Sequence, residues 1–511
     1  MTPSLDYCRR QAKSLRKTFA QGAPDSLNRV AAVLGQVRDL PHSAALHVVA
    51  REQGYDSWPK MKFAVETAQL GRADLAERLK YALFQGTHWA VARLLDETPD
   101  LADDQFGLLC ALYRKDAVQA WLDREPGIVS RPLQGPRRAI LHLAFSRHFQ
   151  AHPDLKNDML AVAQALVLAG ADVNDSYPSA PDSPHMLSAL YGAIGHANNM
   201  DLGQWLLDQG ADPNDGESLY HSTELGHHDG LRMLLAAGAD PSGTNALLRA
   251  LDFNDHEAVE MLLAGGARPD DFNPDPVGGE DPWVVPALHQ AARRMNDARM
   301  VSLLIDRGAD IGRVYQGYDA YVYARVYGNT SLAQAIENSG RASTLGPNET
   351  LLALAADDAL PAGKLLDQSD VPAPFRTLIR DILHLPGKLG HVQRLVGLGL
   401  DSEQPDREGL TALHIAGWEG LPKMMTYLLT LNPDLTYING YGGNLVTTIL
   451  HGAENCPARA ERDYAKCLEL ALEQGLPLGR NVLAESSDPA VLHVIETWVN
   501  DNPDRLVDQI P

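Results

Sequence analysis

The nine residues MLLAAGADP (233–241) return almost unchanged as MLLAGGARP (261–269), 28 positions further along the chain. Self-similarity at so short an interval is the signature of a protein built from stacked structural repeats. Other copies of the phrase are LVLAGAD (166–172), LLDQGAD (206–212), LLIDRGAD (303–310), LVGLGLD (395–401), LLTLNPD (428–434) and LALEQGL (470–476). The sequence therefore predicts an array of similar units rather than one globular core.

The repeated phrase predicts the end of a helix. Its paired leucines would face a core, and its glycine would take the left-handed conformation at which many helices stop. Asn432 stands where other copies have glycine, and asparagine is the next most tolerant residue in that conformation. Another helix is predicted upstream, most clearly in GLTALHIAGWEG (409–420), where Thr411 would cap it and Leu413 and Ala416 would be buried. Similar helix starts are ILHLA (140–144), ALYGA (189–193), PALHQAA (286–292) and AYVYA (320–324).

The segment REGLTALHIAGWEGLPKMMTYLLTLNPD (407–434) resembles the ankyrin repeat family. It follows the family's Gly-x-Thr-Pro-Leu-His opening, with Ala412 where proline is usual. By repeat spacing the resemblance extends over residues 75–500. It implies an all-α fold, an α-solenoid of about thirteen helix-turn-helix repeats, several of them degenerate. Degenerate helix pairs are predicted at 79–100, 107–127, 349–368, 377–399 and 481–499.

The loops between the helix pairs differ in length. Gly399 to Thr411 is twelve residues, whereas Gly238 to Asn245 is seven, so five residues are missing from the loop that ankyrin proteins fold into a β-hairpin finger. The same loss occurs between Gly210 and Glu217. The loops that lead from Gly170 to Ser188 and from Gly266 to Pro286 are instead eighteen and twenty residues long. Fingers are therefore predicted to be short in the middle of the array and long on either side.

The first seventy residues do not follow the repeat. The segment AREQGYDSWPKMK (50–62) resembles a short helical module that precedes ankyrin arrays in many bacterial proteins. Ser57 is predicted to cap a helix that tolerates Pro59 in its first turn, and Tyr55 and Trp58 are predicted to lie in a small core. The chain is therefore identified as resembling a bacterial ankyrin repeat-containing protein. Its predicted parts are a helical N-terminal module (1–70), the ankyrin solenoid (71–500) and a C-terminal tail (501–511).

Composition and charge narrow the function classes. Residues 1–65 carry a net charge of +5 and the whole chain carries −22, so the remainder carries −27. Such an acidic body favours a basic partner and disfavours nucleic acid and anionic membranes. No apolar run approaches the roughly 18 residues that span a bilayer, and no signal peptide is visible. The four cysteines are too few for a disulfide framework and are predicted to be buried thiols of a cytoplasmic protein: Cys8, Cys110, Cys456 and Cys467.

No motif of a known catalytic or cofactor site is present, so we predict no enzyme activity, cofactor or metal. HSTELGHHD (221–229) has three histidines at spacings compatible with zinc. His221 falls on a first helix and His227 in the following turn, which favours a structural role. The acidic loop 268–282 lacks the spacing of a calcium site and is interpreted as a solvated loop. The family's recurring histidine, to which the resemblance assigns hydrogen bonds between repeats, is present as His142, His289 and His414.

Aromatic residues provide the candidate binding site. In VYQGYDAYVYARVYG (314–328), Tyr321 is predicted to be buried and Tyr315 to lie in a finger, with Tyr323 and Tyr327 on the exposed side of a first helix. Large aromatic side chains on an exposed face bury much area at little entropic cost when a partner binds. The predicted partner-binding set is Tyr315, Tyr323, Tyr327, Ile415, Trp418, Tyr437 and Tyr441, of which the last two lie in a finger.

These features predict a non-catalytic, monomeric scaffold or adaptor that binds a partner protein with the fingers and concave face of an acidic solenoid. One alternative is an inhibitor or immunity-like protein whose acidic groove blocks a basic enzyme. Another is a regulator that contacts DNA through residues 1–65, where Arg51, Lys60, Lys62 and the segment 8–17 would meet phosphates. Nucleic acid binding is disfavoured because no cluster suited to reading bases precedes the second helix of that segment.

Overall fold

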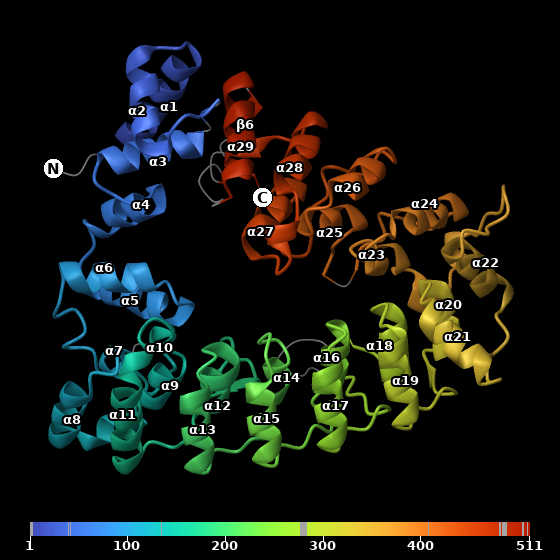
Figure 1. The fold of residues 1–511 in the computed structure, drawn as a ribbon, viewed down its shortest axis with the longest axis horizontal. Coiled ribbons are helices and arrows are strands. Elements are labelled where there is room, and N and C mark those ends of the chain that lie inside the picture. Colours follow the sequence, from blue (N-terminus) through green and yellow to red (C-terminus); the bar gives the residue numbers. More distant parts are fainter. Residues whose placement is uncertain are drawn as a thin grey trace. The chain divides into compact units, whose positions relative to one another are not determined.

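The computed structural model describes residues 4–38, 40, 42–133, 135–275, 284–406, 408–479, 482, 488–502, 505–507 and 509–510. The chain forms two compact units and is mostly helical, as predicted (Figure 1). Unit 1 comprises Met1–Ala68, Arg325–Gly328 and Thr344–Pro511, and unit 2 comprises Gln69–Ala324 and Asn329–Ser343. The predicted boundaries at 70 and 500 are not tested by this division and stay a prediction.

Unit 2 is a succession of antiparallel helix pairs. Its first pairs are α5 (Arg72–Gln85) with α6 (His88–Glu97), α7 (Phe106–Ala111) with α8 (Lys115–Arg124), α9 (Ala139–Ala144) with α11 (Lys156–Leu168), and α12 (Ala189–Tyr191) with α13 (Met200–Asp208). The following pairs are α14 (Ser218–Ser222) with α15 (Asp229–Ala236), α16 (Ala246–Asp252) with α17 (His256–Ala264), α18 (Ala287–Arg293) with α19 (Ala298–Asp306), and α20 (Ala320–Tyr327) with α21 (Thr330–Asn338). The short helix α10 (His148–Ala151) precedes α11, and a π-helical turn, η3 (Gly192–His196), follows α12.

Unit 1 contains the N-terminal helices and the C-terminal part of the array. The N-terminal helices are α1 (Leu5–Ala20), α2 (Pro24–Leu34), α3 (His42–Glu52) and α4 (Trp58–Thr67). The C-terminal part contains α22 (Pro347–Ala356), α23 (Leu378–Ile382), α24 (Leu389–Leu398), α25 (Ala412–Trp418), α26 (Pro422–Leu429), α27 (Leu445–Asn455), α28 (Tyr464–Glu473) and α29 (Pro489–Asp501). Two short parallel strands, β5 (Leu478–Gly479) and β6 (Leu506–Val507), pair with each other, and α29 packs against α3.

The predicted helix ends are confirmed. Gly238 and Gly266 follow their helices with φ of 91° and 107°, and Asn432, which replaces glycine, has φ of 54°. These values lie in the left-handed region, where glycine pays no steric cost and asparagine pays little. Thr411 also caps α25 as predicted, because its hydroxyl oxygen accepts the backbone N–H of His414. The residues of the repeated phrase therefore end the second helix of each pair.

The aspartate of the phrase has a role that the sequence did not reveal. The Asp212 carboxylate accepts the backbone N–H of Asn214 at 2.9 Å, and Asn214 Oδ1 in turn accepts the backbone N–H of Asp240 in the next repeat at 2.7 Å. The same bond between repeats joins Asn174 to Asp212, Asp270 to Asp310, Gln368 to Asp401 and Glu403 to Asp434. We call these bonds the side-chain ladder. The ladder fixes the spacing of consecutive loops.

We expect Asn214→Ala to lower the free energy of unfolding by about 1 kcal/mol, because it removes the acceptor for the Asp240 N–H. Asn214→Asp keeps an oxygen at the same place, as Asp270 does naturally, and should retain most of the stability. Urea denaturation of the full chain measures both variants. Equal losses for the two substitutions would show that the ladder contributes nothing at this position.

Loop lengths shape the fingers as predicted. The long loop between α11 and α12 forms an antiparallel hairpin of β1 (Ser176–Pro178) and β2 (Met186–Ser188). A smaller hairpin of β3 (Val314–Tyr315) and β4 (Tyr318–Asp319) precedes α20. The two trimmed loops, 209–217 and 237–245, are described throughout and contain no strand. The centre of the other long loop, 276–283, lies outside the described residues, as does most of the predicted calcium-like acidic segment beyond 275.

The N-terminal helices enclose their own small core. Cys8, Leu15 and Met61 lie in this core, and Tyr55 and Trp58 pack against it, as predicted. Ser57 caps α4, because its hydroxyl oxygen accepts the Lys60 N–H at 3.4 Å. All four cysteines are buried and free, which confirms that they are not disulfide-bonded.

One predicted helix pair is wrong. The segment 349–368 forms only its first helix, α22, and no second helix follows in the described residues 357–367. Pro361 lacks the N–H that a helix interior needs, and Gly363 adopts φ of 72°. Leu366 instead donates its backbone N–H to the carbonyl of Leu398 at 2.7 Å. In the predicted pair at 481–499 only α29 is described, because most of 480–487 lies outside the described residues.

Candidate functional site

A row of aromatic side chains crosses the first helices of unit 2. Consecutive first helices pack directly on one another, so residues at similar positions along them line up. The ring centroids of Phe84 and Phe145 are 6.0 Å apart, those of Phe145 and Tyr191 are 5.9 Å apart, and His221 lies 5.0 Å from Tyr191 and 5.1 Å from Tyr220. The aromatic row, as we name it, consists of Phe84, Phe145, Tyr177, Tyr191, Tyr220 and Phe253.

The end of the row at α16 faces solvent. Phe253, directly after α16, is 52% exposed. Arg249 lies between this ring and that of Tyr220, with its guanidinium carbon 4.9 Å and 5.9 Å from the two centroids. Exposed aromatic rings beside an arginine have the composition of binding hot spots in protein interfaces. This end of the row is therefore suited to contact another protein.

A cleft of about 630 Å³ opens beside the row, where the loops are trimmed. One wall is the end of the long hairpin, including His185 and Met186, and the other walls are the short loops that follow α13 and α15. Three carboxylates line it, those of Asp215, Glu217 and Asp240. A full-length finger would cover this space, so the missing residues of the two loops account for the opening.

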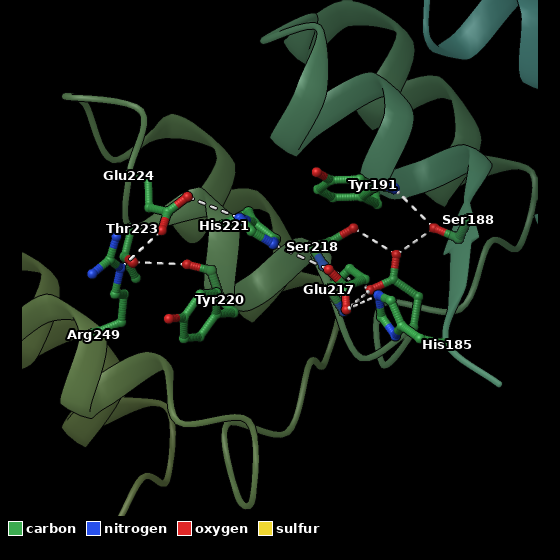
Figure 2. Close-up of polar contacts among 11 residues, drawn as sticks. His185, Ser188, Tyr191, Glu217, Ser218, Tyr220, His221, Thr223, Glu224 and Arg249 are labelled. Carbon is green, nitrogen blue, oxygen red and sulfur yellow. Dashed lines mark hydrogen bonds and ion pairs between the residues drawn. The ribbon is translucent and has the colours of Figure 1, made fainter. Parts of the chain in front are cut away.

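Glu217 is the centre of a chain of alternating acids and bases at the cleft (Figure 2). Its side chain is only 1% exposed, and its two oxygens lie 2.9 Å from His185 Nε2 and 3.1 Å from His221 Nε2. His221 Nδ1 lies 2.8 Å from Glu224 Oε2, and Arg249 donates from Nε to Glu224 Oε1 at 2.8 Å. The chain therefore runs from the hairpin to α16 and ends at the aromatic row.

The charges of these contacting acidic and basic side chains stabilise one another. Burial disfavours a charged imidazole, but hydrogen bonds to Glu217 and Glu224 and the charges of both carboxylates raise the pKa of His221 to about 9. Burial likewise disfavours the Glu224 carboxylate, but His221 and Arg249 lower its pKa below the usual value. His221 is therefore protonated at neutral pH and Glu224 is ionised, so the contact between them is a true ion pair.

The loop that carries Glu217 is fixed by Asp215. The Asp215 carboxylate accepts the hydroxyl of Ser188 at 2.5 Å and the hydroxyl and backbone N–H of Ser218 at 2.6 Å and 2.8 Å. These donors come from the hairpin and from the start of α14. Asp215 thus ties the long finger to the first trimmed loop and holds Glu217 in place.

The three histidines of 221–229 do not converge. His221 lies on α14 and His227 in the turn after it, as predicted, and each histidine has its own partner. His227 Nε2 lies 2.9 Å from Asn198 Oδ1, and His228 Nε2 lies 2.8 Å from Asp255 Oδ2. Among the residues that the structure describes, no group of three histidine, cysteine or acidic side chains could hold a metal ion. The contacts of these histidines are therefore structural.

The recurring histidines are neutral and buried. Burial lowers the pKa of His142, His289 and His414 to about 4 in each case. His289 Nε2 lies 3.0 Å from the carbonyl oxygen of Tyr318 in the next hairpin, which confirms a bond between repeats there. The expectation is wrong for the other two. His142 contacts Leu133 in the loop before its own helix, and His414 contacts Thr411, its own helix cap.

Two residues of the predicted binding set are not exposed. Tyr323 and Tyr327 are only 2% and 1% exposed, so the prediction that they face solvent is wrong. The Tyr323 ring packs edge-on against His289, and the Tyr327 hydroxyl donates to Asp381 Oδ2 at 2.9 Å. Neighbouring first helices cover both rings and satisfy the buried hydroxyl of Tyr327. Tyr321 is buried as predicted.

The remaining predicted residues lie in separate units. In unit 2, Tyr315 is in the β3–β4 finger, half-buried against Phe272. In unit 1, Tyr437 packs against His414, and Tyr441, which is 73% exposed, lies in the same loop, as predicted. Ile415 and Trp418 are half-buried on α25. The predicted set is therefore divided between the two units.

Three residues of the candidate site were missed although their register was readable. Tyr191 and Tyr220 occupy the position in their helices that holds His289 in a later repeat, three residues after the cap position. Glu217 occupies the cap position itself, where Ser188 and Thr411 stand in other copies. A comparison of copies at equal register would have singled out all three.

Sequence profiles match the repeats that form most of this site. The family described as ankyrin repeats in three copies matches residues 186–273, and the single ankyrin repeat matches residues 286–314. The chain contains ankyrin repeats. Ankyrin repeats are generally scaffolds for protein interaction and are typically without enzyme activity. Most of the cleft and the α12–α16 part of the aromatic row lie within the three matched repeats.

Solved ankyrin structures resemble the chain. The crystal structure of the human ASB11 ankyrin repeat domain is 22% identical, covers 47% of this chain and 99% of its own, and superposes with a TM-score of 0.34. An ankyrin repeat domain from Acinetobacter baumannii AYE is also 22% identical, covers 38% of this chain and 98% of its own, and has a TM-score of 0.29. A comparison with curated proteins gives no significant match. Among the described residues, no helix has the length and apolar character needed to cross a membrane.

Proposed function

We propose that this ankyrin repeat protein is a non-catalytic scaffold that binds a partner protein across the aromatic row and the adjoining cleft. The observation that carries the proposal is that most of the cleft and the row residues Tyr191, Tyr220 and Phe253 share the three repeats at 186–273. The exposed ring of Phe253 and the half-buried rings of the row supply apolar contact area, whereas Phe145 is buried and makes no contact with a partner. The cleft supplies a few fixed charges that orient a partner. An array of repeats positions both without any movement of the scaffold.

The proposed partner is basic where it enters the cleft. Asp215, Glu217 and Asp240 line that space, and the net charge of the whole chain is −22. An acidic surface attracts a basic partner over distances of about 10 Å at roughly 0.1 M salt and accelerates association. Tyr315, Ile415, Trp418, Tyr437 and Tyr441 stay in the proposal as secondary contacts, whereas Tyr323 and Tyr327 are removed from it because they are buried.

We further propose a monomeric, cytoplasmic protein, since all four thiols are free and buried, which suits a reducing compartment. The same acidic cleft also favours a second function, inhibition of a basic enzyme. DNA binding by residues 1–65 has less support. Arg51 and Lys60 both pair with Asp56, and Lys62 pairs with Glu66, so these cations are partly neutralised.

The double substitution Tyr220→Ala with Phe253→Ala is expected to reduce capture of the partner at least about tenfold, because truncated hot-spot aromatics cost 2 kcal/mol or more. Native lysate passed over the immobilised full chain, with bound proteins identified by mass spectrometry, measures this. Leu168→Ala is the matched control, since Leu168 is 78% exposed but lies on the second helix of its pair. Capture of the same proteins in equal amounts by the double variant and the wild type would refute the proposal.

Salt separates the two proposed functions from each other. A scaffold that relies on the aromatic row should retain its partner at high salt, because apolar burial is not screened. An inhibitor that relies on the acidic cleft should release one strongly basic enzyme as salt increases, and that enzyme should regain its activity on release.

A further inference from the structure

The end of the aromatic row at α5 holds a cluster of positive charge. The guanidinium carbon of Arg137 lies 5.0 Å from the ring centroid of Phe84, 5.6 Å from that of Tyr177 and 6.0 Å from that of Phe145. These rings come from α5, from the hairpin strand β1 and from the residue after α9. Arg137 is therefore held by three aromatic side chains from three separate elements, an arrangement that favours a cation.

A second arginine is fixed next to the same rings. Arg147 donates from Nε to the carbonyl oxygen of His196 at 3.1 Å, and its backbone N–H donates to Leu83 at 2.9 Å. The His196 ring packs against Phe84 at a tilt of 35°, with centroids 4.1 Å apart. Burial, together with the charges of Arg147 and Arg137, lowers the pKa of His196 to about 4. Both guanidinium groups therefore lie close enough to His196 to act on the same ring.

Neither arginine has an acidic partner in the described residues. No Asp or Glu oxygen described by the structure lies within 4.0 Å of the guanidinium nitrogens of Arg137 or Arg147. Nearby arginines of unit 2 are paired, as Arg138 is with Asp175 and Arg249 with Glu224. Burial lowers the pKa of both Arg137 and Arg147 below the usual value. Glu77 attracts Arg137 only from beyond ion-pair distance. A partly desolvated cation without a direct counter-charge is costly, and an anion from outside the chain would reduce that cost.

We propose that Arg137 and Arg147 form a binding site for a carboxylate of the partner protein, an acidic side chain next to an apolar residue. This inference rests on the proposed function and adds the chemistry of one contact. The planar guanidinium fork matches a carboxylate, and the rings of Phe84 and Tyr177 would receive the apolar neighbour. Extended polyanions are disfavoured, because the chain outside residues 1–65 carries a charge of −27.

The site also implies an orientation for the partner. It connects to the Glu217 cleft through Tyr191, whose ring lies 5.9 Å from Phe145 and 5.0 Å from His221. The partner would thus place an acidic group at Arg137 and a basic group at the exposed carboxylate of Asp240 in the cleft. Reversing the partner along the row would bring like charges together, and such contacts suppress wrong binding modes.

The experiment titrates the full-length protein with N-acetyl-L-phenylalanine, which joins a carboxylate to an aromatic ring, and with its neutral amide as the matched probe. Saturation-transfer NMR measures both affinities. We expect the acid to bind at least about tenfold more tightly than the amide, the gain of a charge-assisted hydrogen bond. Arg137→Gln should abolish this preference. Arg137→Lys should weaken it, because lysine keeps the charge but loses the planar stacking.

Arg232→Gln is the control, since Arg232 is exposed on α15 and paired with Asp229 and Glu257. Circular dichroism melting shows whether each variant is folded, and Arg147→Lys provides a second variant if Arg137→Gln is not. Equal affinity for acid and amide, or an unchanged preference in Arg137→Gln, would overturn the carboxylate site. Displacement of the acid by inorganic phosphate at a lower concentration than by acetate would overturn it in favour of a phosphate site. Partner capture that still depends on Tyr220 and Phe253 would leave the scaffold function standing in either case.

Discussion

Gly399→Ala is expected to lower the free energy of unfolding by about 3 kcal/mol, because two separate costs apply at this position. Gly399 ends α24 with φ of 114°, a conformation that a side chain opposes. An added Cβ would also lie 2.5 Å from the carbonyl oxygen of Leu366. That carbonyl belongs to backbone held by the bond from the Leu366 N–H to Leu398, so it cannot move aside without breaking this contact.

A nearby glycine provides a control substitution that should raise the free energy of unfolding rather than lower it. Gly397 lies inside α24, and an added Cβ would meet nothing within 4 Å. Gly397→Ala should therefore raise the free energy of unfolding by about 0.5–1 kcal/mol, because alanine loses less entropy in a helix than glycine. Urea denaturation followed by circular dichroism measures both variants in the full chain. Destabilisation by both substitutions to a similar extent would contradict the geometry assigned to Gly399.

Glu217→Gln is expected to lower the free energy of unfolding at neutral pH by about 1.5–3 kcal/mol, since the protonated His221 loses one of its two carboxylate partners. Glu217 contacts His221 at 3.1 Å, and Glu224 remains at 2.8 Å from the other ring nitrogen. His185 loses its partner as well. The damage should concentrate at the cleft, so hydrogen exchange should increase first in α14 and in the hairpin end near His185.

The pH dependence of this loss follows from His221. Its pKa in the folded protein, about 9, lies above its ordinary value of 6.5. The stability that the charged His221 contributes is therefore fully present below pH 6.5 and is lost as the pH rises through 9. The difference between wild type and Glu217→Gln should be large at pH 6.5 and small at pH 10.

Glu257→Gln is the comparison, because Glu257 is exposed and pairs with Arg232 and His228 at the surface. Exposed pairs contribute about 0–1 kcal/mol, so this variant should resemble the wild type at every pH. A difference between wild type and Glu217→Gln that stays constant from pH 6.5 to pH 10 would refute the ion-pair chain.

Local signals in the sequence predicted the ends of helices well. Gly238, Gly266 and Asn432 adopt left-handed conformations, and Thr411 caps its helix, because a few adjacent residues decide these features. Burial is different, since it depends on what packs from either side. Tyr323 and Tyr327 lie on a helix whose amphipathic pattern indicated an exposed face, but neighbouring helices cover that face.

The candidate site depends both on local sequence signals and on packing between distant segments. Tyr191 and Glu217 occupy fixed register positions, so a comparison of repeat copies could predict their neighbourhood. The approach of Arg137 to Phe84, 53 positions earlier, and of His196 to Phe84, 112 positions apart, has no local pattern. It arises from the way α5 meets the turns after α9 and α12, which only the folded chain shows.

The side-chain ladder bears on how such a chain can change in length. In each rung the donor is a backbone N–H, as at Asp212, Asp240 and Asp434, and the acceptor is any side-chain oxygen, whether of asparagine, glutamine, aspartate or glutamate. The junction between two copies therefore does not depend on which two copies meet. Duplication or deletion of a whole copy, as by unequal recombination, would restore a complete rung at the new boundary. The contacts of Arg137 with its three rings, by contrast, require particular residues at particular positions. The array can therefore gain or lose copies outside residues 84–196 without loss of that site.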